Sequence, residues 1–425
     1  MTDPTVDGAL RKVRRRLIPF LFLLYIVAYL DRVNVGFAAL DMNRALGFSA
    51  SVYGLGSGIF FLSYTLLEVP SNLMLARVGA RLWIARIMLT WGVLSTAMIF
   101  VHSPAGFYAI RFLLGAAEAG FFPGLILYLT QWFPNRERAG AVSLFMTATA
   151  MAGVVGAPIS SALLQLHGWW GLDGWQWLFL LEGLPAILLA PVVLMRLTER
   201  PQDATWLTED ERGALSREIE ADHGRPDADP PHTTFRSAIK SRTLWALALI
   251  YCCIVTAFYG VSFWLPQIVQ STSGLGSTTI VLLSAIPYVA ATVGLVVIGS
   301  RSDRTRERAR HLATACMIGA VGFIVTTALP QSLALSLAAL SIAAFGIWGA
   351  LGPFWAMPTA LLSGTAAAGG IALVNSVGNI GGFVGPYAIG WIREQTGGFG
   401  SGLLALAVVL IVGAVVSLRL RREAN

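Results

Sequence analysis

The chain has 425 residues, of which 56% are hydrophobic and 12% are charged, and its formal net charge is +7. Because soluble globular domains carry about 25% charged residues, this composition argues against a soluble enzyme and against a disordered chain. The basic residues form short clusters between apolar runs, so a nucleic-acid partner is not expected. Cys252, Cys253 and Cys316 lie in apolar runs without metal-ligand spacing. We therefore expect no metal, no cofactor and no disulfide framework.

Apolar runs follow one another along almost the whole chain. A spanning helix needs about 20 apolar residues, and outside a polar start and a polar middle stretch the chain has room for twelve such helices. In chain order we expect them at 17–40, 52–76, 82–101, 104–132, 140–165, 175–197, 242–270, 278–300, 310–329, 333–361, 367–392 and 399–419. The first run is not a cleaved signal peptide, because it continues into Asp31 and Arg32 and no small-residue cleavage site follows.

Basic residues are distributed unevenly between the two sides of the expected membrane. An even number of spans puts both termini on one side, where the loops and ends hold Arg11, Lys12, Arg14, Arg15, Arg16, Arg77, Arg81, Arg136, Arg138, Arg301, Arg304, Arg306, Arg308, Arg310, Arg419, Arg421 and Arg422. The loops of the other side hold only Arg44 and Arg393. The positive-inside rule therefore predicts a multi-pass protein of the cell inner membrane with both termini in the cytoplasm.

The polar middle stretch separates two similar parts of the chain. Within it, 207–220 has the pattern of an amphipathic surface helix that starts with a capping box formed by Thr208 and Glu211. Short basic turns follow both the second and the eighth span, which indicates an internal repeat. The sequence thus predicts an all-α membrane protein with twelve transmembrane helices in two pseudo-symmetric six-helix bundles. We expect these bundles over 1–197 and 242–425, with a cytoplasmic linker over 198–241.

Four segments carry a family resemblance: RRLIPFLFLLYIVAYLDRVNVGFAAL, FFLSYTLLEVPSNLMLARVGARLWIARI, RFLLGAAEAGFFPGLILYLTQWFP and NSVGNIGGFVGPYAIGW. They resemble the major facilitator superfamily and, within it, the anion:cation symporter family, over nearly all of 11–420. The loop motif Gly-x-x-x-Asp-Arg/Lys is intact at Gly299–Arg304, whereas Ala76 stands where the first half would have its Asp, as is typical of this subfamily. Bacterial carriers of tartrate-like hydroxy acids and of sugar acids are the most similar, with galactonate and phthalate carriers as cousins.

Span 1 carries two charged residues near its middle, Asp31 and Arg32. Ionisable side chains at that depth cost about 2.5–3.5 kcal/mol on insertion scales and are functional hypotheses by default. Tyr25, Tyr29 and Arg32 follow an i, i+4, i+7 pattern and share one helix face. We expect Arg32 to attract an anion, Tyr29 to hydrogen-bond it and Asp31 to take a proton; the alternative is a local ion pair that fixes packing. The resemblance supports function, because the family's Tyr-x-Asp-Arg segment serves substrate binding and proton coupling.

Span 4 carries Arg111 and Glu118, which lie two turns apart on one face, with Gly115 thinning the helix between them. If Arg111 engages Glu118 in one conformation only, the proton affinity of Glu118 changes during transport. The alternative is a permanent structural ion pair. We expect Asp31, Glu118 and Arg111 to form the proton-coupling set.

Three further charged residues stand in the spans of the first half. Glu68 is interpreted as packing or gating against the Arg77 turn, Glu182 as a partner for a neighbouring helix, and Arg86 as a partner near the inner end of span 3. Tyr64, on the same span as Glu68, is deep enough to touch substrate, and the resemblance matches it to a ligand contact.

The second half has no buried acid or base in its expected spans and offers amides and aromatic rings instead. Asn375 and Asn379 lie one turn apart on span 11, and Trp355 lies on span 10. Core packing is the alternative for each aromatic residue, but the resemblance matches Asn379 and Trp355 to ligand positions. With charge in the first half and amides in the second, we expect a substrate with one anionic end and one hydroxyl-rich end. The expected binding residues are Tyr29, Arg32, Tyr64, Trp355, Asn379 and Asn375.

These observations predict a proton-coupled symporter that imports a small organic carboxylate by alternating access and works as a monomer in the bilayer. Coupling to sodium stays open. The main alternative is an antiporter that exports drugs or metabolites; Gly156-Ala157-Pro158 interrupts the Gly-Pro pair that such antiporters favour in span 5, which weighs against it. An intramembrane enzyme is disfavoured because the sequence has neither His-Glu-x-x-His nor Gly-x-Ser-x-Gly, and no nucleotide-binding loop suggests a pump.

Overall fold

The computed structural model describes residues 4–224, 241–329, 332–361 and 364–424, and these residues are almost entirely helical. The long helices are α1 (Pro4–Leu46), α2 (Ala50–Val78), α3 (Ala80–Thr96), α4 (Pro104–Glu118), α5 (Phe121–Thr130), α6 (Asn135–Leu164), α7 (Gly174–Arg196), α8 (Glu209–Gly224), α10 (Arg242–Gln270), α11 (Ser277–Leu283), α12 (Ala285–Thr305), α13 (Arg308–Ala328), α14 (Leu333–Leu361), α15 (Gly364–Thr396) and α16 (Gly400–Ala424).

Among the described residues, 11 helical segments are long and apolar enough to cross a membrane. They correspond to eleven of the twelve expected spans. The twelfth, 367–392, lies in the helix α15, which holds Asn375, Asn379 and several glycines and is not among those 11 segments. Large apolar side chains such as Leu66, Leu188 and Val408 stand exposed on the outside of the helices, where a bilayer would cover them. The expected all-α membrane fold is confirmed.

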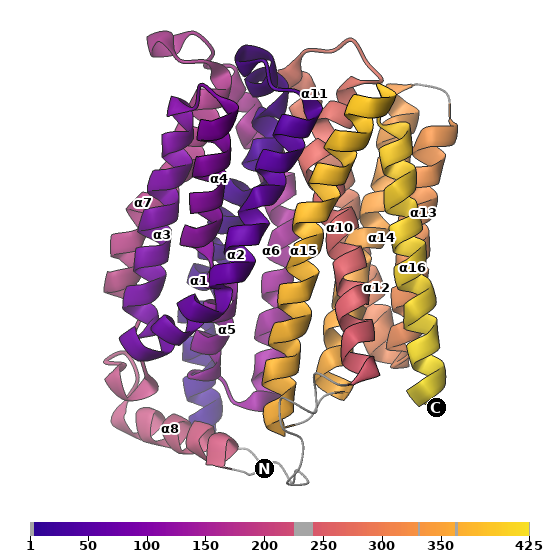
Figure 1. Ribbon diagram of the computed structural model, residues 1–425. Helices are drawn as coiled ribbons and strands as arrows, with labels where there is room; N and C mark the ends of the chain where they lie inside the picture. The colour runs from indigo at the N-terminus through magenta and orange to yellow at the C-terminus, as the bar shows by residue number, and fades with distance from the viewer. Residues whose placement is uncertain (1–3, 225–240, 330–331, 362–363, 425) are drawn as a thin grey trace.

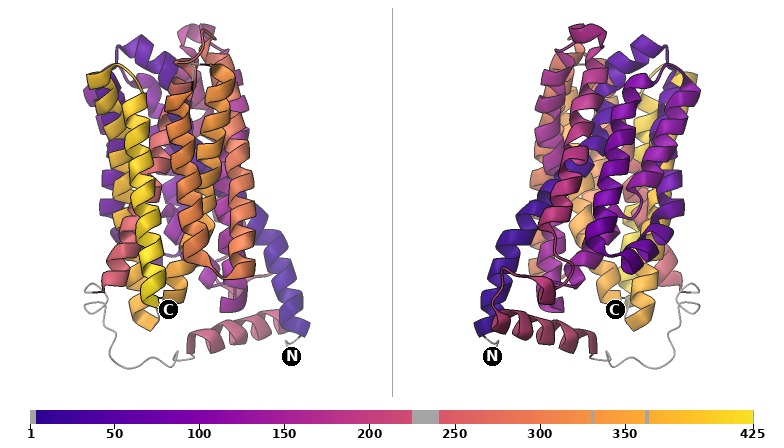
Figure 2. Two further views of the ribbon diagram at one scale, coloured as in Figure 1. Left: turned by 90° about the vertical axis from the view of Figure 1, so that its right-hand side faces the viewer. Right: turned by 90° about the vertical axis from the view of Figure 1, so that its left-hand side faces the viewer.

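The helices run roughly side by side along one axis (Figure 1). Helices α1 to α7 lie on one side of the molecule and α10 to α16 on the other, and α2 packs against α15 along the line where the two groups meet. Both termini and α8 lie at the same end, as the side views in Figure 2 also show. We call this the terminal end and the opposite one the distal end; the expected placement of both termini on one side is thus met.

Helix α1 begins at Pro4, well before the expected start of the first span at 17. Its added turns bury Val6, Leu10 and Val13, and α1 packs against the surface helix α8. The polar N-terminal segment is therefore part of a packed helix, because its apolar stripe lies against α8.

Helix α8 starts with the expected capping box. The Glu211 backbone N–H donates to Thr208 Oγ1 at 3.3 Å, and the Thr208 N–H donates to Glu211 Oε2 at 2.9 Å. Lys12 Nζ of α1 lies 2.7 Å from Glu211 Oε1. This ammonium donates a hydrogen bond that holds the pKa of the Glu211 carboxyl below its usual value.

The expected span 104–132 is present as the helical segment Pro104–Thr130, but its helix is interrupted. It is broken between α4 and α5, where Gly120 adopts a left-handed conformation with φ 84°. A Cβ atom at Gly120 would lie 2.4 Å from Ser71 Oγ, so only glycine fits the break. Glu118 is consequently the last residue of α4. Broken helices of this kind are frequent where a transporter binds its cargo.

Gly115, one turn before the break, allows α4 to approach α2 closely. A Cβ atom there would lie 2.0 Å from the Phe60 carbonyl oxygen. The expected thinning of the helix at Gly115 therefore has a packing reason. It brings the face that carries Arg111 and Glu118 against α2.

Candidate functional site

A cavity of about 70 Å³ lies where the two groups of helices meet. Tyr25, Tyr64 and Asn379, which line it, stand near the middle of α1, α2 and α15 respectively. The full lining is Tyr25, Tyr29, Arg32, Tyr64, Phe122, Thr149, Tyr251, Val255, Phe258, Tyr259, Leu351, Trp355, Asn375 and Asn379. Ligand pockets usually measure about 300–1,000 Å³, so this central cavity is contracted.

All six residues expected to bind substrate line the central cavity. Tyr29, Arg32 and Tyr64 come from the first half of the chain, and Trp355, Asn375 and Asn379 from the second. The structure therefore brings them together across more than 300 residues of sequence. That they bind substrate stays a prediction.

Arg32 is the charged centre of this cavity. Its Nη2 pairs with Glu118 Oε1, and its Nη1 donates to the Tyr259 hydroxyl at 3.2 Å. The guanidinium also lies over the ring of Tyr64, 5.2 Å from its centroid. Since a guanidinium on an aromatic face is favoured by cation–π attraction, Arg32 is held by both halves of the chain.

One polar atom at the cavity, Arg32 Nε, is buried without a hydrogen-bond partner among the described residues. A buried donor left unpaired costs about 1–3 kcal/mol. Tyr29 also lines the cavity, and its hydroxyl has the Tyr259 hydroxyl as a hydrogen-bonding neighbour. The partner that Arg32 Nε lacks is an acceptor, such as a carboxylate oxygen.

The partner of Glu118 differs from the one considered in the sequence. Arg111 is fully buried, but its Nε and Nη2 donate to the backbone carbonyls of Gly56 and Ser57 in α2, both at 3.3 Å. In this structure Glu118 pairs with Arg32 instead. An Arg111–Glu118 ion pair would therefore require another conformation, and Arg111 does not line the central cavity.

Asp31, like Glu118, is not among the residues that line the central cavity, and its role in proton coupling stays a prediction. Ser95 Oγ of α3 and Asn34 Nδ2 both donate to its Oδ1, the latter at 2.9 Å, and the side chain is 3% exposed. Consecutive helical residues point about 100° apart. With Arg32 turned to the cavity, Asp31 must face α3.

A second buried acid, Glu182 of α7, accepts a hydrogen bond from Ser160 Oγ of α6 at 2.6 Å. It thus has the neighbouring-helix partner that the sequence suggested. Its other oxygen, Oε2, has no partner among the described residues. Asp31 and Glu182 together give the interior of the first half two carboxyls that neutral donors hold.

The structure corrects the interpretation of Glu68, which does not act against the Arg77 turn. Asn375 Nδ2 donates to Glu68 Oε1 at 2.5 Å, and Asn379 Nδ2 donates to Oε2 at 3.4 Å. A buried carboxylate of α2 is thereby tied to α15 across the line where the two halves meet. The i, i+4 spacing of Asn375 and Asn379 puts both amides on one face of α15, but it does not indicate that Glu68 lies opposite that face.

Buried charges and amides at mid-depth, placed between two groups of spanning helices, define the architecture of a secondary transporter. Residues 21–386 match the Major Facilitator Superfamily, and the chain belongs to this family. It is a transporter of this superfamily and not an enzyme.

Two curated relatives are similar over their whole length. The chain is 49% identical over 424 residues to the "Putative tartrate transporter" of Agrobacterium vitis, covering 100% of this chain and 97% of the relative. It is 41% identical over 412 residues to the quinolone resistance transporter of Acinetobacter baumannii, covering 96% and 94%.

A solved structure has the same fold. The crystal structure of a bacterial homologue of the human lysosomal transporter Spinster, in an inward-facing and occupied conformation, matches with a TM-score of 0.77 and 20% identity. The match covers 96% of this chain and 97% of that one. It supports the fold and no finer function.

Proposed function

We propose that this transporter is a proton-coupled symporter that imports a small organic carboxylate, a tartrate-like hydroxy acid or a sugar acid, by alternating access across the inner membrane. The parts 1–197 and 242–425 act as two bundles, the terminal end lies in the cytoplasm and the monomer is the working unit. One observation carries the proposal: a buried arginine, paired with a carboxylate, faces a cavity whose other wall bears amides.

Glu118 is the proton carrier in this mechanism. While ionised, it occupies Arg32 and competes with any incoming anion. A proton on the Glu118 carboxylate removes that competition, and the Arg32 fork can then donate two parallel hydrogen bonds to a substrate carboxylate. Proton and anion therefore favour each other's binding, as linkage requires. One co-transported proton cancels the cost of moving a monocarboxylate against a negative-inside potential, about 2.3 kcal/mol per charge per 100 mV, whereas a dianion such as tartrate requires two protons.

Recognition of the rest of the substrate falls to the second half. The side-chain amides of Asn375 and Asn379 offer donors and acceptors to hydroxyl groups, and the ring of Trp355 packs beside Tyr251 with centroids 4.9 Å apart. A substrate that takes the amides must displace Glu68 from them. Substrate binding would thus break the hydrogen bonds between Glu68 and the two asparagines, and the substrate itself would then connect the two halves.

Uptake of labelled tartrate into proteoliposomes tests this proposal, with an inward pH gradient, with a sodium gradient and with neither. We expect accumulation with the pH gradient alone, and competition by other hydroxy acids and sugar acids but not by neutral polyols. Accumulation that follows sodium and ignores pH would overturn proton coupling. Absence of uptake for the whole panel of acids would overturn the substrate class.

A second candidate is export of aromatic drugs in exchange for protons. It is favoured by the drug-resistance relative and by the aromatic lining of the central cavity, which includes Phe122, Phe258 and Tyr259. Counterflow distinguishes the two functions. Preloaded tartrate should drive uptake of labelled tartrate in an importer of hydroxy acids, whereas a drug exporter should show counterflow only with a fluoroquinolone.

A further inference from the structure

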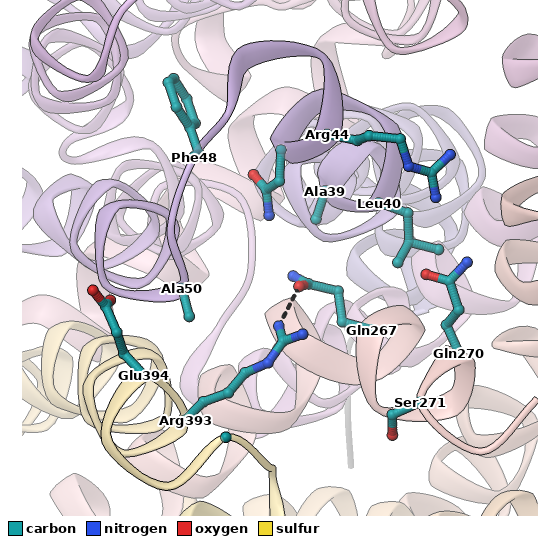
Figure 3. A pocket seen from close by; sticks show the side chains of 12 residues that line it. Ala39, Leu40, Arg44, Phe48, Ala50, Gln267, Gln270, Ser271, Arg393 and Glu394 are labelled. Carbon is teal, nitrogen blue, oxygen red and sulfur yellow. Dashed lines mark hydrogen bonds between the residues drawn. The ribbon is translucent and has the colours of Figure 1, made fainter.

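A second cavity, of about 520 Å³, opens at the distal end (Figure 3). It lies between the end of α1 and the start of α2 on one side and the ends of α10 and α15 on the other. Its lining is Ala39, Leu40, Asn43, Arg44, Phe48, Ala50, Gln267, Gln270, Ser271, Arg393, Glu394 and Gly397. This distal cavity has the size of a ligand pocket, whereas the central cavity does not.

The two basic residues of the distal loops, Arg44 and Arg393, both line this cavity. Arg393 Nη1 donates to Gln267 Oε1 at 2.8 Å, as the dashed line in Figure 3 shows. Gln267 is only 7% exposed, and its Nε2 donor has no partner among the described residues. An arginine and a buried, unpaired amide N–H thus stand side by side in the cavity wall.

The acidic residues nearby are already engaged. Glu394 Oε2 accepts from the Ser51 backbone N–H at 2.8 Å and from Ser49 Oγ at 3.1 Å, at the start of α2. Asp41, which does not line the cavity, accepts from Ser277 Oγ at 2.8 Å and lies 3.8 Å from Arg44. The lining holds two arginines against one carboxylate, Glu394, so its net charge is positive, and Gln267 Nε2 is a donor without a partner among the described residues; both features suit an anion.

Aromatic side chains of α2 and α10 pack beside Arg393, where these helices meet α15. The Arg393 guanidinium lies 5.5 Å from the Trp264 ring centroid, and Trp264 Nε1 donates to the Pro386 carbonyl at 3.0 Å. Tyr53 packs edge-on against Trp264 and donates to the Phe263 carbonyl at 2.8 Å. These contacts join α2 to α10 and α15, so they close the distal end where the halves meet.

We propose that the distal cavity is a capture site that binds a carboxylate of the transported acid before the distal end opens. Its identity as a substrate site rests on the proposed function, since the same carboxylate would pass from here to Arg32. Arg393 and Gln267 Nε2 form the binding pair, and Arg44 supplies charge at the rim. A cleft with a net positive charge raises the local concentration of anions and their association rate, by about 10-fold or more.

The contact between Arg393 and Trp264 gives capture a second consequence. An anion that draws the guanidinium into the cavity loosens its hold on Gln267 and on the Trp264 ring. Both of those groups belong to the layer that closes the distal end. Capture of the carboxylate thus weakens the closed state.

Cysteine protection tests the capture site directly. Ser271 lines the cavity and is exposed, so a Ser271→Cys variant, with Cys252, Cys253 and Cys316 replaced by Ala, can be labelled in detergent with a neutral thiol reagent. We expect tartrate to slow this labelling several-fold and glycerol to leave it unchanged. A His102→Cys variant, exposed at the same end but outside the cavity, is the control and should label equally fast with and without tartrate.

Two further substitutions, each combined with Ser271→Cys, distinguish a failure of the capture site from a failure of the proposed function. Arg393→Gln should abolish protection of Ser271→Cys, whereas Arg32→Lys, which alters the central cavity, should keep it. Protection that disappears in Arg32→Lys and persists in Arg393→Gln would mean that tartrate acts from the central cavity, and would overturn the capture site. Protection without any tartrate uptake by the parent protein would instead contradict the proposed function alone. No protection in either background would overturn the capture site.

Transport kinetics give an independent test through Arg44, whose side chain is 72% exposed. We expect Arg44→Gln to raise the KM of tartrate uptake about threefold and to reduce its dependence on ionic strength, with the maximal rate nearly unchanged. Arg217→Gln on α8 removes one positive charge at the terminal end and serves as the matched control. Equal KM values for the two variants would contradict a role of Arg44 in capture.

Discussion

Glu118 and Asp31 are both buried carboxyls of the first half, yet their surroundings differ. Glu118 ends a broken helix and pairs with a full positive charge, Arg32, which lines the central cavity. Asp31 lies in the interior of the first half, where the neutral donors Ser95 and Asn34 hold it. A ligand that enters the central cavity can compete for the partner of Glu118 but cannot reach the partners of Asp31.

This difference in partners means that the two buried carboxyls respond to a ligand in different ways. An ion pair at the cavity wall changes when a ligand arrives, because ligand and carboxylate bind the same arginine. A carboxyl held by neutral groups between α1 and α3 responds only if those helices move. We therefore expect Glu118 to couple directly to substrate, and Asp31 to act through helix packing within its own half.

The largest effect is expected from Arg32→Lys. Lysine keeps the charge but loses the planar fork that donates two parallel hydrogen bonds to a carboxylate. A hydrogen bond to a charged group is worth about 1.5–3 kcal/mol, so the affinity for tartrate should fall about 10- to 100-fold. Calorimetric titration of the purified protein measures this, with Arg86→Lys near the terminal end of α3 as the matched control. Unchanged affinity in Arg32→Lys would remove Arg32 from the binding site.

The second prediction sets Glu118→Gln against Asp31→Asn. Glutamine is neutral and imitates protonated Glu118, so this variant should still exchange tartrate but should not accumulate it under a pH gradient. Its exchange rate should also become nearly independent of pH between about 5 and 8, because the competing charge is gone.

Asp31→Asn should behave differently from Glu118→Gln if Asp31 acts through helix packing. Its tartrate affinity should stay within about threefold of the parent, because no ligand contact is lost, while accumulation falls in proportion to the disturbance of α3. If Asp31→Asn lost substrate affinity and Glu118→Gln did not, the assignment of the two carboxyls would be reversed. Parent-like accumulation by both variants would exclude both as coupling residues and would favour sodium coupling or facilitated diffusion.

A smaller effect is expected from Glu68→Gln. The glutamine amide can still contact Asn375 and Asn379, but the charge-assisted hydrogen bonds become neutral ones, which are roughly half as strong. The link between α2 and α15 weakens, and the two halves should separate more often at the central cavity. Distances between spin labels on α2 and α15 should broaden toward longer values, and Glu182→Gln, which removes a buried acid away from this line, should leave them unchanged.

The sequence located the helices because they follow from local periodicity, whereas the lining of the central cavity was predicted partly from periodicity and partly from the family resemblance, which singled out Tyr64, Trp355 and Asn379. Apolar runs set the spans, and the i, i+4 and i+7 positions of Tyr25, Tyr29 and Arg32 put them on one face, which the structure shows turned to the cavity. The partners of Glu118 and Glu68 could not be read in the same way. They depend on how α1, α4, α2 and α15 pack across the chain, and periodicity carries no information on which faces meet.

Two other features needed the three-dimensional structure. The break at Gly120 depends on close packing against Ser71 of α2, because glycine is also tolerated inside continuous helices. The distal cavity arises where the ends of four helices meet around Arg393 and Gln267. The sequence showed only that Arg393 is one of two basic residues in the distal loops.

The smallest predicted effect lies at the terminal end, far from both cavities. The pKa of Glu211 is lowered in the folded protein by the hydrogen bond from Lys12, so docking of α8 on α1 gains stability above the ordinary carboxyl pKa and loses it as the pH falls through the lowered value. The pair is partly exposed, and such pairs contribute about 0–1 kcal/mol. The protection of the α8 amides, which is their exchange rate compared with the intrinsic rate at the same pH, should therefore fall slightly below about pH 4.5, and Glu211→Gln should show the lower protection already at pH 7. Glu220→Gln, which lies on the same helix outside the capping box, is the control. If Glu211→Gln exchanged as slowly as the parent at pH 7, the docking of α8 would depend on its apolar face alone, and the Lys12 contact would have no part in it.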